Sequence, residues 1–134
     1  MSQENVELVR SSIEAYNAGD RDRYVDFFAE DVEVCPDASR FPEAKPFRGR
    51  EEFRRYLADI DQGWEGGGRA EIGEVSSVGN RVVARVDWGG RGLTSGIDLR
   101  SDLTAVCTIR DGRIAKIEYF FDHAQALEAV GLSK

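Results

Sequence analysis

Histidine and cysteine are scarce in this 134-residue chain, and basic residues are fewer than acidic ones. It holds one histidine, two cysteines, and 18 basic against 25 acidic residues. A structural zinc site takes about four ligands, mostly Cys and His, and His123, Cys35 and Cys107 do not supply such a set. A nucleophilic cysteine would need a histidine nearby as its base. We therefore expect two separate buried thiols, with no disulfide and no metal.

The net charge of -7 excludes further classes of function. Nucleic-acid binding and attraction to anionic membranes both need a basic surface. No apolar run approaches the ~20 residues of a membrane-spanning helix, and the N-terminal MSQENVELVR lacks the basic-then-apolar pattern of a signal peptide. We expect a cytoplasmic protein that binds neither nucleic acid nor membrane.

Nucleotide-binding and hydrolase motifs are also missing. The chain has no GxGxxG, no P-loop and no GxSxG, so we expect no cofactor. Its length fits one domain over residues 1–134, with enough chain to bury a core.

Apolar periodicity predicts a helical first half and a strand-rich second half. Helices are expected from the N-terminus to Gly19 and over residues 21–29 and 50–62, strands over 32–35, 70–78, 82–88, 99–109 and 114–121, and a closing turn or helix over 123–130. Residues 36–46 hold all three prolines and are expected to be loop, and residues 89–96 a glycine-rich bend. The order predicts an α+β fold in which helices cover one face of a curved antiparallel sheet.

Three motifs carry a family resemblance: NxGDxxxxxxxFxxD from Asn17, FRGREEF from Phe47 and DGRIAKIEYFFD from Asp111. In this order and spacing they resemble the nuclear transport factor 2-like superfamily, and within it the SnoaL-like domain. The resemblance implies a cone-shaped sheet with three N-terminal-half helices on its concave face. It also implies a pocket for a small hydrophobic molecule and a homodimer through the outer sheet face. That face would present Thr104, Val106, Thr108, Lys116 and Glu118.

Side-chain alternation along the strands predicts which residues face inward. With aromatic residues from the helices and the glycine-rich connection 63–68, the expected pocket lining is Tyr16, Tyr56, Trp64, Val86, Trp88, Leu103, Ala105, Cys107, Ile117, Tyr119 and Phe121. The same residues would also suit ordinary core packing. Trp64 could be a flap over the pocket or could pack on the third helix.

The resemblance implies several enzyme branches, and this chain has only some of the catalytic residues that each of them needs. A ketosteroid isomerase needs a tyrosine, a protonated acid and a carboxylate base. The first two positions fall at Ser12 and Ala105, and the third at Pro36, where only the neighbouring Asp37 offers a base.

The other two branches depend on different acids. A limonene-epoxide-hydrolase-like site would use Arg85 and Asp87, but its water-activating aspartate falls at Tyr119, and alternation turns Arg85 and Asp87 outward. A SnoaL-like cyclase would use Asp122, which could equally cap the last helix. The catalytic candidates are thus Asp37, Asp87 and Asp122. Two functions stay open: a domain that binds a small apolar ligand, and a cyclase, isomerase or hydrolase that acts on such a molecule.

Overall fold

The computed structural model describes residues 2–37 and 45–131 of the chain. In chain order the elements are α1 (Ser2–Asn17), α2 (Arg21–Asp26), β1 (Phe28–Cys35), β2 (Phe47–Arg48), α3 (Arg50–Asp61), β3 (Arg69–Val78), β4 (Arg81–Arg91), β5 (Asp98–Arg110), β6 (Arg113–Phe120) and α4 (His123–Ala129). No helix in the described ranges combines the length and the apolar character that crossing a membrane requires.

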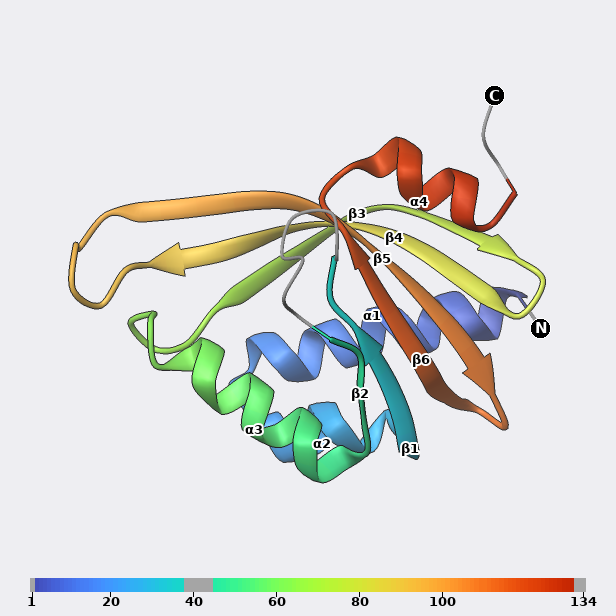
Figure 1. The fold of residues 1–134 in the computed structure, drawn as a ribbon, viewed down its shortest axis with the longest axis horizontal. Helices are drawn as coiled ribbons and strands as arrows, with labels where there is room; N and C mark the ends of the chain where they lie inside the picture. The colour runs from blue at the N-terminus through green and yellow to red at the C-terminus, as the bar shows by residue number, and fades with distance from the viewer. Residues whose placement is uncertain (1, 38–44, 132–134) are drawn as a thin grey trace.

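One six-stranded sheet carries the fold, with its strands in the order β2-β1-β6-β5-β4-β3. Strands β3 to β6 form the expected antiparallel meander, while β1 lies parallel to β6. In Figure 1, α1, α2 and α3 lie together beneath one face of the bent sheet, and α4 crosses its other face. The predicted α+β fold class, with helices on one side of a curved sheet, is confirmed.

The boundary between α2 and β1 differs from the sequence prediction. The helix ends at Asp26 and the strand begins at Phe28, where we expected helix to residue 29 and strand only from residue 32. Phe28 is fully buried and pairs with Ile114 of β6, so packing against the sheet overrides the local helical pattern. The short strand β2 was not predicted. Much of the expected loop, residues 38–44, lies outside the described part of the chain.

The expected bend over residues 89–96 is also corrected, because β4 continues through it to Arg91. A Cβ atom on Gly89 would lie 1.9 Å from the carbonyl oxygen of Leu99. Glycine therefore permits a close approach of the two strands there instead of breaking the strand. The chain turns only at residues 93–95, and the β4–β5 hairpin projects well beyond the helices (Figure 1).

Polar side chains fasten the helices to one another and to the sheet. Gly19, with φ +82°, ends α1 in the left-handed region that favours glycine, and Asp20 caps α2 by accepting a hydrogen bond from the backbone N–H of Arg23 at 3.0 Å. The Asn17 amide donates to the Ala70 carbonyl at 2.6 Å and accepts from the Ala70 N–H at 2.8 Å. Since β3 is an edge strand, Asn17 takes the place of a strand partner.

Arg21 joins the three concave-side helices. Its Nε donates to the Asp61 carboxylate at 2.8 Å, and its guanidinium lies 3.9 Å above the Tyr16 ring. It also donates to the Tyr16 carbonyl. Because Asp61 closes α3 and Tyr16 belongs to α1, one side chain of α2 fixes the spacing of the other two helices.

The aromatic part of the core packs edge to face. Phe28 and Phe53 are fully buried with ring centroids 4.8 Å apart, and Tyr24 lies 5.0 Å from Phe28. Such pairs add roughly 0.5–1.5 kcal/mol beyond the burial of their area. This cluster joins α2, β1 and α3.

Truncation of Phe53 should therefore destabilise the whole domain. We expect Phe53→Ala to lower the free energy of unfolding by about 3–5 kcal/mol, measured by urea denaturation. The control Phe53→Leu keeps most of the volume and should cost under about 1.5 kcal/mol. A loss below 1 kcal/mol for Phe53→Ala would contradict this account of the core.

Candidate functional site

A cavity of about 280 Å³ lies between the concave face of the sheet and the helices. Helices, strands and the segment after β1 all contribute to its wall. The lining residues are Ile13, Tyr16, Tyr24, Pro36, Asp37, Tyr56, Leu57, Ile60, Ala70, Val86, Trp88, Leu103, Ala105, Ile117, Tyr119 and Phe121. The wall is almost entirely apolar, with tyrosine hydroxyls, the Trp88 indole N–H and one carboxylate as its exceptions.

Nine of the eleven residues proposed from the sequence as pocket lining reach this cavity. The other two, Trp64 and Cys107, do not. Trp64 packs edge to face on Trp88 at 5.3 Å, so it supports the wall from behind. Cys107 is 2% exposed and packs in the core; like Cys35 it is a free thiol.

Sequence reasoning missed several lining residues on the helices. Ile13 lies one turn before Tyr16, and Ile60 one turn after Tyr56, so helical spacing from the two tyrosines could have found both. Tyr24 gave no such signal, because α2 is too short to define an apolar face.

Hydroxyl groups gather on one part of the wall. The Tyr16 hydroxyl accepts a hydrogen bond from the Trp88 indole N–H at 2.9 Å. Burial raises the pKa of Tyr16, Tyr56 and Tyr119 above the ordinary tyrosine value. At neutral pH these phenols stay protonated, so they present hydrogen-bond donors and acceptors without charge.

Asp37 is the one carboxylate lining the cavity among the residues the structure describes. It follows β1 directly and is 6% exposed. Its Oδ2 accepts a hydrogen bond from the backbone N–H of Phe121 at 2.7 Å. This bond ties the end of β1 to the end of β6 and holds the carboxylate at the wall.

The other two catalytic candidates, Asp87 and Asp122, lie outside the cavity. Asp87 is exposed on the outer sheet face and accepts from Arg100 at 3.2 Å, because it alternates with the inward-facing Val86 and Trp88. Asp122 caps α4, accepting from the Ala124 N–H at 2.9 Å. The cap was the alternative that the sequence left open.

The Arg85–Asp87 step and His123 also lie away from the cavity wall. Arg85 bonds to Asp102 at 2.9 Å across the outer face and not to Asp87. The Nδ1 of His123 lies 2.8 Å from the Thr104 hydroxyl, at the start of α4. Neither has a position from which it could act on a molecule in the cavity.

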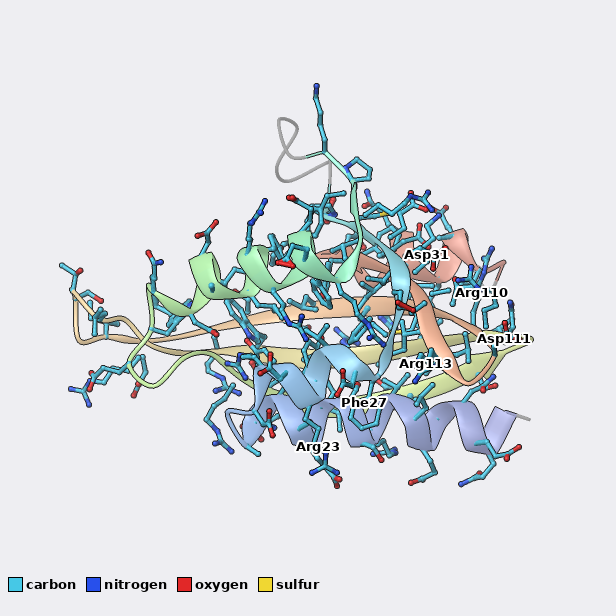
Figure 2. All side chains as sticks on the ribbon, turned by 90° about the horizontal axis from the view of Figure 1, so that it is seen from below. Arg23, Phe27, Asp31, Arg110, Asp111 and Arg113 are labelled. Carbon is cyan, nitrogen blue, oxygen red and sulfur yellow. The ribbon has the colours of Figure 1, made fainter. Side chains whose placement is uncertain are left out.

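A second, polar hollow of about 300 Å³ lies at the far end of the β5–β6 hairpin. Figure 2 shows Asp31, Arg110, Asp111 and Arg113 gathered there. Arg110 donates to Asp31 at 2.7 Å and thereby lowers the pKa of that exposed carboxyl, and Arg113 donates to the Asp26 carbonyl. Both arginines therefore already bond to groups of this chain and connect the ends of neighbouring elements. The apolar cavity is the better candidate for a ligand site.

A metal centre finds no support in the described ranges. Within them, no three His, Cys, Asp or Glu side chains come together in a way that could hold an ion. The polar side-chain groups of the cavity wall are the phenols, the Trp88 indole N–H and Asp37, a set that suits hydrogen bonding to an organic molecule.

A family model described as the SnoaL-like domain matches residues 9–117. The match runs from α1 into β6 and so includes most of the cavity wall. The chain belongs to this SnoaL-like family. The resemblance carried by the three sequence motifs is confirmed, and the curved sheet with its concave-side helices is the SnoaL-like fold.

Solved structures share this SnoaL-like fold over nearly their whole length. TerC, co-crystallised with polyporic acid, has a TM-score of 0.76 and 22% identity, covering 95% of this chain and 97% of that one. A nuclear transport factor 2-like protein of unknown function from Burkholderia pseudomallei K96243 has a TM-score of 0.75 and 20% identity, covering 96% and 98%. A protein provisionally assigned as a polyketide cyclase, from Xanthomonas campestris pv. campestris, has a TM-score of 0.74 and 22% identity, covering 97% and 98%. At these identities the likeness shows the fold. Among curated proteins, none matches the chain.

The buried thiol beside the cavity predicts a pH dependence of stability. Burial raises the pKa of Cys107 to about 12, so the native state keeps a proton that the unfolded chain loses near the ordinary value of 9.0. Its contribution to stability is complete below about pH 9 and falls as pH rises, by about 1.4 kcal/mol per pH unit up to about pH 12.

Urea unfolding of the wild type and of Cys107→Ala across this range isolates that contribution. The variant should lose stability less steeply above about pH 9, by about 1.4 kcal/mol per pH unit. Below about pH 10, tyrosines stay largely protonated even in the unfolded chain, so the difference in slope between pH 9 and 10 reports the thiol. Identical slopes would mean that the thiol does not keep its proton in the fold.

Proposed function

We propose that this SnoaL-like domain binds a small, largely apolar, aromatic or polyketide-like molecule in the cavity between its sheet and its helices. The single observation that carries the proposal is a mostly apolar cavity of about 280 Å³ that has tyrosine hydroxyls, the Trp88 indole N–H and Asp37 as side-chain polar groups in the described residues. Ligand pockets are commonly about 300–1,000 Å³, mostly apolar, with a few placed polar groups.

The chemistry of the wall defines the ligand class. Aromatic rings and aliphatic side chains favour a planar or compact hydrophobic body. Neutral phenols on Tyr16, Tyr56 and Tyr119 favour carbonyl or hydroxyl groups at its edge, because a phenol both donates and accepts. TerC, of similar fold, was co-crystallised with polyporic acid, which supports using that compound as the first probe.

A substitution that fills the cavity should abolish binding. Ala105 is 6% exposed and lies in the cavity wall on β5, so Ala105→Phe would put a ring into the space of the ligand. Thermal shift with polyporic acid, small terpenoids, aromatic polyketide fragments and steroids provides the measurement. A ligand at 100 times its dissociation constant stabilises by about 2.7 kcal/mol, on the order of 10 °C here.

Ala58→Phe is the matched control, because Ala58 is exposed on α3 and the same substitution there leaves the cavity open. We expect shifts in the wild type and Ala58→Phe, and none in Ala105→Phe. No shift with any compound class in the wild type, or an equal shift in Ala105→Phe, would contradict binding in this cavity.

Catalysis is the second candidate function, and one observation favours it: a carboxylate fixed at the wall of an apolar cavity. Asp37 could take or give a proton at a bound carbonyl compound by general acid–base catalysis. The neutral phenols would then hydrogen-bond the developing oxyanion. The provisional cyclase assignment of the Xanthomonas protein supports polyketide-like carbonyl compounds as the substrates to test.

Asp37→Asn separates binding from catalysis. The amide still accepts the hydrogen bond from Phe121 but cannot take a proton, so ligand binding should change by less than about threefold while turnover falls by about 10²–10⁴-fold. Product formation is followed by mass spectrometry of polyketide fragments incubated with each protein. Asp122→Asn, which keeps the α4 cap, should turn over substrate like the wild type. Binding without product in the wild type would remove the catalytic candidate and leave the binding one.

A further inference from the structure

The hydroxyl groups of the cavity wall are not equivalent. All four tyrosines of the chain line the cavity. Tyr16 accepts a hydrogen bond from the Trp88 indole N–H at 2.9 Å, and the hydroxyls of Tyr24 and Tyr119 bond to each other. The Tyr56 hydroxyl has no hydrogen-bond partner among the described residues. Tyr16 is therefore the phenol whose bonding direction is set by a neighbour that can only donate.

The direction of the Trp88–Tyr16 bond leaves one proton for a ligand. Because an indole N–H cannot accept, the Tyr16 oxygen is the acceptor in this bond. The phenol's own proton then points away from the indole, and no hydrogen bond within the described chain takes it up. Since Tyr16 lies in the cavity wall, its O–H group is placed to donate to a molecule in the cavity.

Two neighbours make this O–H group a stronger donor. The Arg21 guanidinium lies 3.9 Å from the centroid of the Tyr16 ring, and the indole N–H bonds to the phenol oxygen. Burial raises the pKa of Tyr16, so the group keeps its proton at neutral pH, while the indole bond and the Arg21 charge act in the opposite direction. Both neighbours favour negative charge on the oxygen and thereby polarise the O–H bond.

A carbonyl oxygen matches this donor. It accepts a hydrogen bond and has no proton of its own to place. A hydrocarbon at the same point would leave the Tyr16 proton without an acceptor in a wall that is almost entirely apolar, which weakens binding. A ligand hydroxyl would need another acceptor for its own proton, because the indole N–H of Trp88 competes for the Tyr16 oxygen.

We propose that Tyr16 binds a carbonyl oxygen of the ligand, and that Trp88 is the positioning residue that makes Tyr16 a donor at this point and not an acceptor. This inference rests on the proposed ligand-binding function. It narrows the ligand class to aromatic or polyketide-like carbonyl compounds: ketones, enones or quinones. The indole N–H and the Arg21 guanidinium act on the ligand through the Tyr16 hydroxyl.

The position of Asp37 favours one orientation of such a ligand. Asp37 follows β1 and bonds to the Phe121 N–H at the end of β6, whereas Trp88 lies on β4. The sheet order β1-β6-β5-β4 puts these positions three strands apart, which is about 14 Å along the sheet. A carboxylate repels the negative end of a carbonyl group, so the carbonyl faces Tyr16 and the rest of the molecule faces Asp37.

Three probes with one bicyclic skeleton test the Tyr16 contact in the full chain. α-Tetralone carries C=O, α-tetralol carries CH–OH at the same carbon, and the third analogue has an exocyclic methylene in place of the oxygen. Isothermal titration calorimetry gives their dissociation constants. In the wild type the ketone should bind about tenfold more tightly than the methylene analogue. Tyr16→Phe removes the donor and should reduce that ratio to below about threefold.

Trp88→Phe tests the positioning role, because it keeps an aromatic ring and removes the indole N–H. The Tyr16 oxygen can then accept as well, so the affinity of tetralol relative to tetralone should rise about threefold or more above the wild-type ratio. A merely structural role for Trp88 would weaken all three probes alike and leave the ratios unchanged. Trp64→Phe is the matched control. Trp64 packs on Trp88 at 5.3 Å outside the cavity wall, and both ratios should stay at wild-type values.

The infrared C=O stretch of bound tetralone provides a readout that does not depend on affinity. Donation from Tyr16 weakens the carbonyl bond, so the band should lie lower in the wild type than in cyclohexane. It should stay low in Trp64→Phe, rise in Tyr16→Phe, and lie between these two in Trp88→Phe. Thermal unfolding of each variant checks that it is folded, and the comparison of wild type with cyclohexane needs no variant.

The outcomes separate this inference from the proposed function. Equal affinity for the ketone and the methylene analogue in the wild type would overturn the role of Tyr16 and leave ligand binding in place. So would binding of polyporic acid with no binding of the three probes, or loss of the ratio in Tyr56→Phe but not in Tyr16→Phe. Wild-type ratios in Trp88→Phe would overturn its positioning role. Absence of binding by every compound would contradict the proposed function itself.

Discussion

The cavity depends on how Arg21 joins three helices to one another and how Tyr16 then joins them to the sheet. Its guanidinium binds Asp61 on α3 and covers the ring of Tyr16 on α1, while the Tyr16 hydroxyl bonds to Trp88 on β4. The Arg21–Asp61 hydrogen bond is charge-assisted, so it is strong and depends on the geometry of its two groups. Moving the helices toward the sheet to fill the apolar space between them would disturb these contacts.

The cavity between these helices and the sheet is lined by few charged groups. Tyrosines in the cavity wall stay neutral because burial penalises the phenolate. Basic residues with described ion pairs bond at the surface or, like Arg21, between helices, leaving the cavity with Asp37 as its described charge. A guest molecule would meet rings, aliphatic groups and neutral hydroxyls, with one acid at a fixed point. Such a site selects by shape and by a small number of polar groups.

Alternation along the strands predicted the part of the cavity wall that β4, β5 and the β6 segment supply, because side chains there follow a period of two. The same alternation predicted that Asp87 faces outward, where the structure places it. The features that the sequence did not predict depend on contacts between residues far apart in the chain. The local sequence predicts helix at Phe28, but the residue pairs with β6 and forms strand. It predicts a bend at Gly89, but the glycine lies within β4 and permits the close approach of Leu99. Arg21 gave no signal, since its partner Asp61 is forty positions away in the sequence. The position of Asp37 at the wall likewise depends on the Phe121 N–H at the end of β6.

The side-chain amide of Asn17 has a consequence for assembly. It occupies the N–H and C=O of Ala70, so the β3 border of the sheet is blocked at that point by the chain's own α1. Open-ended fibres require that each subunit accept neighbours at two borders. Strand addition at Ala70 of β3 would first have to displace the Asn17 amide and its two hydrogen bonds.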